Sequence, residues 1–532
     1  MSMKKTILVL FNVLIVFLIN SFSQSPALIG YWQNWNDGQC PYIQLTQIDT
    51  SYNIIPVAFA VPSSGTTYNM TFIPDGVSQL TLKKQIDTMH LRGKKILISI
   101  GGANDPVSLP DTNKRNTFIS SMMTIINTYG FDGMDIDLEG SSVSVSGGTI
   151  ANPVDAKIIN LIYAIRKIMD IYRAQFGKKM MLTMAPETAY VQGGMSAYAG
   201  VWGAYLPIIN ALRDSIEVLH VQLYNSGSMY GIDGNIYEQG TVDFILSQTE
   251  AVIQGFNTNG GYFTGLRDDQ IAVGLPACSG AAGGGFISTD SVKAAIQYLR
   301  GLAPKPANYT KISSYPMLRG MMDWSVNWDA VTTCGSRYEY ANNFNNIFRP
   351  LQTLNLNLYI QGLYIPAADT TRRDTIRIFL RDTIAPYVIA DSSKAFLNTN
   401  GSAVLTFKNA LNGHRYYLQF KHRNSIETWS RAGGEIFTSS ALSYNFTTSS
   451  SQALGNNLIL VDSSPLRYAV FSGDADQEGR VDLSDIVLIY NDASDFLTGY
   501  INSDVNGDMI TDLTDLLIAN NNSEQFVAVI KP

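Results

Sequence analysis

One ten-residue stretch, Phe131 to Gly140, constrains this chain most, because charged and apolar residues alternate along it. Carboxylates occupy every second position, at Asp135, Asp137 and Glu139. The positions between them are apolar, at Met134, Ile136 and Leu138. Side chains alternate between the faces of a strand, so we expect a β-strand with three carboxylates on one face. Close carboxylates raise one another's pKa, and perturbed carboxylates of this kind are typical of catalytic sites. The alternatives to a catalytic strand are a solvated acidic edge strand and a metal site.

The same stretch resembles the signature of a known enzyme family. Residues 132 to 139 read DGMDIDLE, which matches the DGxDxDxE motif of family 18 glycoside hydrolases, the chitinase family, at each defined position. A second segment, Ser99-Ile100-Gly101-Gly102, resembles the SxGG motif of that family. The resemblance covers roughly residues 26 to 350. It is closest to bacterial members with a Gln-x-Tyr-Asn motif on the sixth strand, here Gln222 to Asn225.

Short apolar segments alternate with longer amphipathic ones over the first 350 residues, the pattern of a parallel α/β sheet. The candidate strands are Ala27–Trp32, Asn53–Ala60, Lys95–Ile100, Gly133–Leu138, Lys179–Met184, Val218–Tyr224, Gln270–Gly274 and Gly320–Trp324. Helical patterns between them include Ile158–Phe176 and Thr289–Leu302. Eight such units predict an α/β TIM barrel, (β/α)8, with its active site at the C-terminal ends of the strands. Six predicted strand ends carry chemically active side chains, including Glu187, which follows Met184-Ala185-Pro186.

The resemblance implies a role for each matching residue. Glu139, outermost on the strand, would be the general acid, and Asp137 would stabilise an oxazolinium ion formed by the substrate's own 2-acetamido group. Asp135 would share a proton with Asp137, and Tyr224 would hold the acetamido oxygen. Trp324 would form the apolar floor under the distorted sugar. Further pocket residues carried over from the family motifs are Tyr31, Phe59, Ser99, Gly101, Met184, Gln222 and Asn225.

This mechanism requires a sugar with a 2-acetamido group, so the resemblance implies a retaining chitinase that acts on chitin or chito-oligosaccharides without a catalytic cofactor. Only about 45 residues separate the seventh and eighth strands, which leaves little room for the α+β insertion that walls the cleft of some relatives. We therefore expect endo-type cutting. The alternatives are an endo-β-N-acetylglucosaminidase acting on N-glycan cores and a chitin-binding lectin without activity.

The N-terminus has the pattern of a signal peptide over residues 1–23, with Lys4 and Lys5 before the apolar run from Ile7 to Ile19. That run is short for a membrane span, so we expect cleavage near Gln24, secretion to the exterior or cell surface, and no remaining membrane anchor. Three cysteines, Cys40, Cys278 and Cys334, allow one disulfide and have no zinc-site spacing. The absence of a basic run argues against nucleic-acid binding.

The chain is too long for one ordinary domain. After the barrel, assigned to residues 24–350, β-type segments predict an all-β sandwich over residues 354–465. These segments are Leu354–Ile360, Thr375–Leu380, Ala403–Phe407, Arg415–Lys421 and Asn457–Val461. This module is expected to be a spacer, with carbohydrate binding as the alternative.

The tail, residues 470–532, contains an internal repeat. Asp474 to Asp485 returns 30 residues later as Asp504 to Asp515, and a helical pattern follows each segment. Oxygen-bearing residues recur at the spacing of an EF-hand-like calcium loop. The predicted ligand positions are Asp474, Asp476, Glu478, Arg480, Asp482 and Asp485, and Asp504, Asn506, Asp508, Ile510, Asp512 and Asp515.

This combination resembles the small α-helical dockerin modules of bacterial polysaccharide-degrading enzymes. The resemblance implies structural Ca²⁺, and a cohesin-like or cell-surface partner is a further expectation. Met509 stands where a loop of this kind normally has glycine, which predicts a weaker second site. The net charge of residues 471–532 is −10, against −7 for the whole chain. The alternative is therefore a merely solvated acidic tail.

Overall fold

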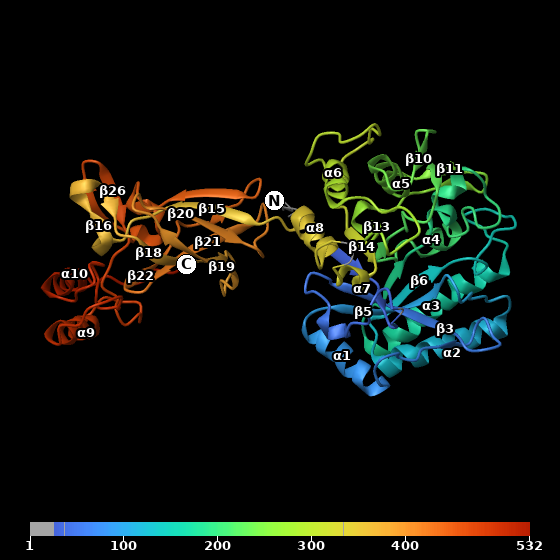
Figure 1. The fold of residues 1–532 in the computed structure, drawn as a ribbon, viewed down its shortest axis with the longest axis horizontal. Coiled ribbons are helices and arrows are strands. Elements are labelled where there is room, and N and C mark those ends of the chain that lie inside the picture. The colour runs from blue at the N-terminus through green and yellow to red at the C-terminus, as the bar shows by residue number, and fades with distance from the viewer. Residues whose placement is uncertain (1–25, 37, 333–334) are drawn as a thin grey trace, which may run out of the picture. The chain divides into compact units, whose positions relative to one another are not determined.

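The computed structural model describes residues 26–36, 38–332 and 335–532, and the chain divides into two compact units between Phe348 and Arg349. Figure 1 shows strands and helices alternating in the first unit and strands predominating in the second. The predicted signal peptide, residues 1–23, and Cys334 lie outside the described residues. Within the described ranges, no helix is long and apolar enough to cross a membrane.

Eight parallel strands form the centre of the first unit, hydrogen-bonded in the order β13-β14-β1-β3-β5-β6-β7-β8. They are β1 (Ala27–Gly30), β3 (Ile54–Pro62), β5 (Lys95–Gly102), β6 (Gly133–Leu138), β7 (Met181–Met184), β8 (Val218–Leu219), β13 (Ala272–Pro276) and β14 (Gly320–Trp324). Bridges from Leu219 to Ile271 and from Gln222 to Gly274 bring the two ends of this series together. The predicted TIM barrel is confirmed.

Helices surround the barrel (Figure 1). They are α1 (Gln79–Leu91), α2 (Thr112–Tyr129), α3 (Ala156–Phe176), α4 (Leu206–Leu212), α5 (Val242–Gln254), α6 (Thr289–Leu299), α7 (Val326–Asp329) and α8 (Glu339–Phe348). Short strands lie in the connections: β2 (Trp32–Gln33), β4 (Met70–Thr71), β9 (Ser228–Tyr230), β10 (Ile236–Glu238), β11 (Phe256–Thr258) and β12 (Gly261–Phe263). The main apolar core lies between the strands and these helices.

The connection from α2 into β6 positions the acidic strand. α2 begins after Asp111, whose side chain accepts a hydrogen bond from the Lys114 amide, and ends at Gly130. Gly130 has a φ of 78°, a left-handed conformation that glycine adopts without a steric penalty. The chain then enters β6, whose apolar side chains join the core beneath the helices: Met134, Ile136 and Leu138. The alternating carboxylates therefore face the barrel interior.

The sixth barrel strand is shorter than predicted. The pattern predicts a strand over Val218–Tyr224, whereas regular pairing in β8 ends at Leu219. The next residues remain extended and bond to both neighbouring strand ends, because the Gln222 amide donates to the Pro186 carbonyl and the Leu223 amide to that of Gly274. The irregular segment keeps Gln222 and Tyr224 on one face, as a regular strand would.

The second unit contains two sheets that share one apolar core. One sheet has the order β20-β15-β24, from β15 (Gln352–Asn357), β20 (Ser402–Phe407) and β24 (Ala441–Asn445). The other has the order β19-β18-β21-β22, with β23 beside β21, from β18 (Asp374–Asp382), β19 (Ile389–Leu397), β21 (Arg415–His422), β22 (Ser425–Trp429) and β23 (Glu435–Ile436). Two small hairpins pair β16 (Tyr364–Ile365) with β17 (Thr370–Thr371) and β25 (Ile459–Ser463) with β26 (Leu466–Ala469). An all-β module therefore follows the barrel.

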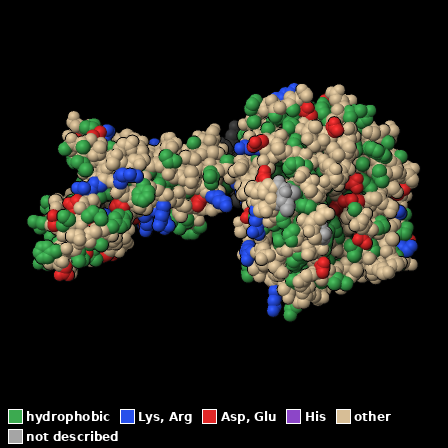
Figure 2. All heavy atoms as spheres, in the orientation of Figure 1, with side chains coloured by type: hydrophobic (Ala, Val, Ile, Leu, Met, Phe, Trp, Pro, Cys, Tyr) green, Lys and Arg blue, Asp and Glu red, His purple; other side chains and the backbone are tan. Residues whose placement is uncertain are grey.

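The tail helices α9 (Leu483–Ser494) and α10 (Leu513–Glu524) belong to the same unit. Each begins with a reciprocal capping box, formed by Asp482 with Asp485 and by Asp512 with Asp515. Ile489 and Ala519 from these helices lie in the core that the two sheets share. Apolar and acidic side chains are exposed at this end of the unit (Figure 2).

We expect that any side chain at Gly133, the first residue of β6, would destabilise the barrel. A Cβ atom at this position would lie 1.9 Å from the Met181 carbonyl oxygen on β7. Gly133→Ala should therefore lower the free energy of unfolding by about 3 kcal/mol, the upper end of ordinary overpacking. In the control Gly147→Ala, the nearest atom is 3.9 Å from the new Cβ, and the change should stay within about 0.5 kcal/mol. Equal urea midpoints for the two variants would contradict this view of the β6–β7 contact.

Candidate active site

The three carboxylates of β6 form a column that becomes more exposed toward its C-terminal end. Asp135 is completely buried, Asp137 is 3% exposed, and Glu139 follows the strand at partial exposure. Their side chains alternate with those that enter the helix-side core, so all three point into the barrel. The column therefore runs from a dry interior to the rim, where a substrate can reach it.

Asp135 is held by three hydroxyl groups, two from the neighbouring strands β5 and β7 and one from Tyr31, which follows β1. Its carboxylate accepts hydrogen bonds from Tyr31 (2.5 Å), Ser99 (2.7 Å) and Thr183 (2.6 Å), and His220 Nε2 lies 3.4 Å from Oδ1. Burial alone would raise the pKa of Asp135, but His220 and the hydroxyl donors outweigh it and hold this pKa below its ordinary value. Asp135 is therefore a fixed negative charge at the base of the column.

Asp137 and Glu139 are linked by one side-chain amide. Gln222 Nε2 lies 2.7 Å from Asp137 Oδ1, 3.0 Å from Glu139 Oε1 and 2.9 Å from the Ala185 carbonyl oxygen. Burial raises the pKa of Asp137 well above its ordinary range, and the charges of Glu139 and Asp135 add to this rise. Burial also raises the pKa of Glu139, while hydrogen bonds with Gln222 and Asp137 limit the rise. The pair therefore retains a proton at pH values where isolated carboxyl groups are ionised.

A cavity of about 560 Å³ opens above this pair. Its lining comes from several strand ends and the loops after them: Asn34, Trp35, Ala58, Phe59, Val61, Gly101, Gly102, Ala103, Asn104, Asp105, Asp137, Glu139, Glu187, Gln222, Tyr224, Asn225 and Trp324. Burial raises the pKa of Tyr224 well above its ordinary value, as do the nearby charges of Asp137 and Glu139. The Tyr224 hydroxyl therefore stays protonated and is able to donate a hydrogen bond to a ligand.

Aromatic rings form one side of the cavity. Trp324 stacks on Phe59, with ring centroids 5.9 Å apart and an interplanar angle of 16°. Tyr31 lies 5.5 Å and Trp35 6.4 Å from the Trp324 ring. Apolar ring faces beside polar and acidic groups suit a sugar, which has apolar C–H faces and hydroxyl edges.

Trp324 is supported from behind by a network that the sequence analysis did not identify. The preceding residue, Asp323, is fully buried, and the Tyr52 hydroxyl lies between two carboxyl groups, 2.5 Å from Asp323 Oδ2 and 2.7 Å from Asp329 Oδ2. Burial raises the pKa of Asp323 well above its ordinary value, and the charge of Asp329 adds to this rise. The Tyr52 hydroxyl therefore connects the end of β14 to the adjoining helix α7 through these two carboxyl groups.

Some predicted pocket residues lie below or behind the cavity rather than on its surface. Tyr31 and Ser99 bond to Asp135 beneath the lining. Met184 is fully buried in the helix-side core because it is paired in register with Ile136, which also faces the helices. The expected position of Met184 in the pocket wall is therefore not what the structure shows. Ala185, one residue later, faces inward.

Glu187 lines the cavity and had no assigned role in the sequence analysis. Burial raises the pKa of Glu187 to about 7, and the charge of Glu139 contributes. No residue within the described ranges donates a hydrogen bond to its carboxyl group. The sequence feature that could have identified Glu187 as a site residue is its position just after a barrel strand. The group is therefore free to meet a ligand.

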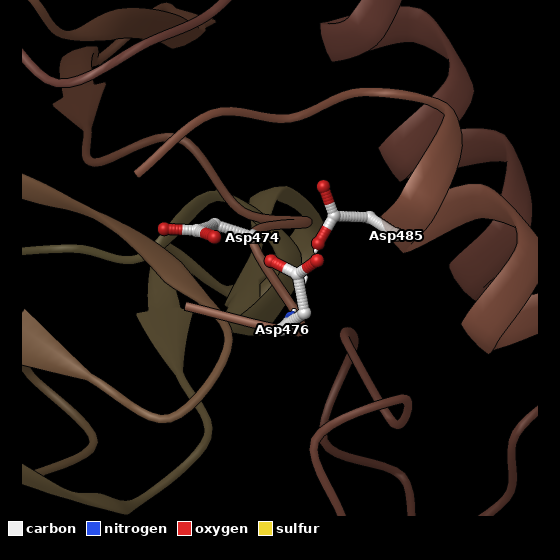
Figure 3. Close-up of side chains that lie close together, drawn as sticks. All are labelled: Asp474, Asp476 and Asp485. Atoms are coloured by element: carbon white, nitrogen blue, oxygen red, sulfur yellow. Dashed lines mark hydrogen bonds between the residues drawn. The ribbon is translucent and has the colours of Figure 1, made fainter. Parts of the chain in front are cut away.

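A second cluster lies in the C-terminal unit. One carboxylate oxygen from each of Asp474, Asp476 and Asp485 lies within 4.8 Å of the others. Figure 3 shows the Asp476 and Asp485 carboxylates facing one another, with Asp474 beside them. Their oxygen chemistry fits Ca²⁺, which takes carboxylate and carbonyl ligands. In the second loop, Asn506 replaces the middle carboxylate of the three.

A TIM barrel whose cavity combines a carboxylate column with aromatic rings has the architecture of a glycoside hydrolase. Residues 27–352 match the model of the family described as glycosyl hydrolases family 18. Because this match spans more than half of the chain, the chain belongs to family 18. Residues 353–532 lie outside the match.

Two curated relatives are similar to this chain over about three fifths of their own length. Chitinase D of Niallia circulans is 44% identical over 336 residues, which cover 62% of this chain and 62% of the relative. Chitinase Chi52 of Paenibacillus xylanexedens is 43% identical over 330 residues, which cover 61% of each chain. The chain thus spans about three fifths of these relatives. The solved family GH18 chitinase of Chromobacterium violaceum is 34% identical, with a TM-score of 0.55 over 61% of this chain and 83% of that one.

The charge coupling at the cavity rim is open to direct test. In Glu139→Gln, the pKa of Glu187 should fall below about 7 because the nearby negative charge is gone, but burial should keep it above the ordinary glutamate value. Carboxyl carbon shifts in a ¹³C NMR titration of glutamate-labelled protein measure this. Asp105→Asn removes another carboxylate of the lining and should leave Glu187 unchanged. An unchanged Glu187 titration in Glu139→Gln would contradict the coupling.

Proposed function

We propose that this protein is a chitinase that hydrolyses β-1,4 bonds between N-acetylglucosamine units with retention of configuration. The observation that carries the proposal is the Asp137–Glu139 pair, which retains a proton above the ionised Asp135 and opens into an aromatic-lined cavity. A retained proton is what a general acid needs near neutral pH. The two curated relatives at 43% and 44% identity carry the name chitinase, which supports the same substrate.

In the proposed reaction, Glu139 donates its proton to the glycosidic oxygen as the bond to the anomeric carbon breaks. The acetamido oxygen of the same sugar attacks that carbon and closes an oxazolinium ring, the substrate-assisted variant of glycosidase chemistry. The Asp137 carboxylate accepts a hydrogen bond from the acetamido N–H and stabilises the positive charge of the oxazolinium ring. The Tyr224 hydroxyl orients the acetamido group. Glu139 then removes a proton from the water that opens the ring, which restores the acid and retains the configuration.

Glu187 supports this choice of nucleophile. A carboxyl group with a pKa of about 7 is largely protonated in mildly acidic solution and is then a poor nucleophile. Glu139 serves as the acid and Asp135 is buried beneath Asp137, so neither is available as the nucleophile. The substrate's acetamido group fills that role.

We also propose endo-type cleavage. In the described residues between β13 and β14, the only helix or strand longer than a turn is α6. No extra wall therefore rises from this connection, and a long chain is able to lie across the cavity. Product sizing from long oligomers tests this point, because an endo-acting enzyme cuts at internal bonds.

Glu139→Gln should lower kcat at least about 10²-fold, the usual scale for loss of a general acid, while oligomer binding persists. Asp137→Asn should be comparably severe because the oxazolinium ion loses its counter-charge. Turnover of N-acetylglucosamine oligomers, with the anomer recorded by ¹H NMR, measures both effects, and the β-anomer should appear first. Asp105→Asn is the matched control.

Each other outcome has a distinct meaning. Initial release of the α-anomer would overturn the retaining mechanism, and near-full activity of Glu139→Gln would overturn the acid assignment. Binding without turnover would favour a lectin. Preferential cleavage of N-glycan cores over chitin oligomers would favour an endo-β-N-acetylglucosaminidase.

For the C-terminal unit we propose a structural Ca²⁺ site, held in the first loop by Asp474, Asp476 and Asp485, with Glu478, Asp482 and Arg480 at the remaining positions. Asp474 is 2% exposed, and burial together with the neighbouring carboxylates raises its pKa to about 7. A divalent cation would relieve this repulsion. The metal would connect the loop to the first turn of α9, and it has no part in catalysis.

We further propose that the protein is exported, with the signal peptide removed near Gln24, and that the tail has a cohesin-like or cell-surface partner. Repeat-related apolar side chains support a partner: Leu483 and Leu513 are 69% and 76% exposed, and Phe496 and Phe526 are 87% and 88% exposed. N-terminal sequencing of protein from the medium tests export. Loss of surface attachment in Phe496→Ser/Phe526→Ser would support the partner.

Calcium should stabilise the C-terminal unit and leave catalysis unchanged. At 100 to 1,000 times its dissociation constant, Ca²⁺ should add about 3 to 4 kcal/mol to that unit's unfolding free energy. Calorimetry with calcium and with chelator measures this, and the same samples are assayed for turnover. Asp474→Asn should remove the calcium effect, whereas Asp495→Asn, exposed and outside both loops, should retain it. Identical curves with calcium and chelator would contradict the site.

A further inference from the structure

The two loops of the tail are equivalent in sequence spacing but differ in their surroundings, and this difference deepens the calcium proposal on which it rests. Asp474 and Asp504 occupy the same first position of the repeat, 30 residues apart. Both are buried, at 2% and 0% exposure. The groups that face these two carboxylates are nevertheless different.

In the second loop, both oxygens of Asp504 are already engaged. Oδ1 accepts hydrogen bonds from the amides of Gly507 (2.9 Å) and Asp508 (3.1 Å), and Oδ2 accepts one from Met509 (3.3 Å). The guanidinium NH2 of Arg423 lies 3.5 Å from the same Oδ2. Asp504 therefore has a cation beside it without any metal.

Arg423 is fixed in this position from several directions. It lies in the turn between β21 and β22, and its Nε donates to Asp374 Oδ2 at 3.2 Å. Its NH1 donates to the backbone carbonyl of Asp504 at 2.8 Å and also to that of Ile501. The guanidinium also lies 4.6 Å from the ring centroid of Tyr500. Such a group is a permanent part of the loop's environment and not a mobile surface charge.

The first loop has one cation of its own, Arg480, but this side chain is exposed and is not fixed against the first ligand as Arg423 is in the second loop. Within the described ranges, no Lys, Arg or His forms an ion pair with Asp474, Asp476 or Asp485. Asp474 Oδ1 accepts one long hydrogen bond, 3.4 Å from the Gly479 amide. The side chain that bonds nearest to it from the neighbouring loop is neutral, Asn502, which donates to the Ala475 carbonyl. The first loop holds five carboxylates and Arg480, and the second holds four carboxylates without Lys or Arg, so each loop has a net charge of −4. The difference between them is therefore Arg423, which comes from outside the loops.

Backbone strain does not separate the two loops. Met509 in the second loop has a φ of 73°, and this left-handed conformation is unfavourable for a side chain other than glycine. The first loop has the same unfavourable left-handed conformation at Gln477, with a φ of 62°. The glycines exchange places, at Gly479 in one loop and Gly507 in the other. The sequence-based reason for a weak second site, Met509 alone, is therefore insufficient.

We propose that Arg423 acts as the built-in counter-charge of the second loop, so that this unit binds one Ca²⁺ tightly, in the first loop, and not two. Calcium affinity in such loops follows the number of ligand charges, and a fixed guanidinium beside the first ligand subtracts from that number. Arg423 also connects Asp374 on β18 with Asp504. The second loop is therefore held on the sheet whether or not metal is present.

Calcium titration of the whole protein by isothermal calorimetry tests the proposal. Wild type should bind one Ca²⁺, with any second event at least about tenfold weaker. Arg423→Gln should strengthen the second event about tenfold or more, while Arg423→Lys, which keeps the charge, should not. Asp474→Asn should abolish the tight event. No binding at all would overturn the calcium proposal itself, whereas two equal sites in wild type would overturn only this inference.

A second measurement needs no variant and therefore survives a folding defect in Arg423→Gln. Amide hydrogen exchange of the wild-type protein should slow on calcium addition across residues 474–485, while residues 504–515 should be protected before calcium is added and change little. Equal slowing in both loops, or slowing confined to residues 504–515, would overturn the assignment. The unchanged second Ca²⁺ event in a folded Arg423→Gln protein would also overturn it.

Discussion

Burial of the acidic column inside the barrel is the constraint on which the catalytic unit depends. Three carboxylates within one strand repel one another, and each loses hydration. The structure resolves this in two ways. Asp135 remains charged because hydroxyl groups and His220 surround it. Asp137 and Glu139 avoid the third charge of the column because the pair retains a proton. The position of each carboxyl group along the column therefore decides whether it stays charged, as Asp135 does, or shares a proton that is available for catalysis, as Asp137 and Glu139 do.

The column works only because neighbouring strands arrive in register. Ser99 is paired with Asp135 across β5 and β6, and Thr183 is paired with Asp135 across β6 and β7. Parallel pairing places these side chains on the same face, so both hydroxyls reach the buried carboxylate. A one-residue slip of either strand would replace a donor with an apolar group. The hydrogen bonds to Asp135 thus link the register of the barrel strands to the raised pKa of Asp137, to which the charge of Asp135 contributes.

Strong periodicity made much of this unit predictable, and weak periodicity explains what was not. The β6 alternation identified the strand, its faces and its carboxylates, and the barrel followed from eight similar segments. Met184 was misplaced because family motifs give identities and not faces, and one residue along a strand reverses the face. His220 carries no local pattern, and Glu187 has only its position after a barrel strand, since the environment that gives each its role comes from distant strands. β19, an edge strand with the polar run Asp391 to Lys394, lacks the apolar alternation by which strands are recognised.

The C-terminal unit shows the same limit in a sharper form. A repeat in sequence predicts two equal sites only if the two copies meet equal surroundings. Here the turn between β21 and β22 lies near both copies, but the guanidinium of Arg423 forms an ion pair with only one of them, at Asp504. Arg423 and Asn424 contact the backbone carbonyl of Asp504 at 2.8 and 2.7 Å. Charge near a ligand changes cation affinity as directly as the ligands do. The tail is therefore not an independent module attached to a spacer, because its second loop takes its electrostatic environment from the sheet on which it rests.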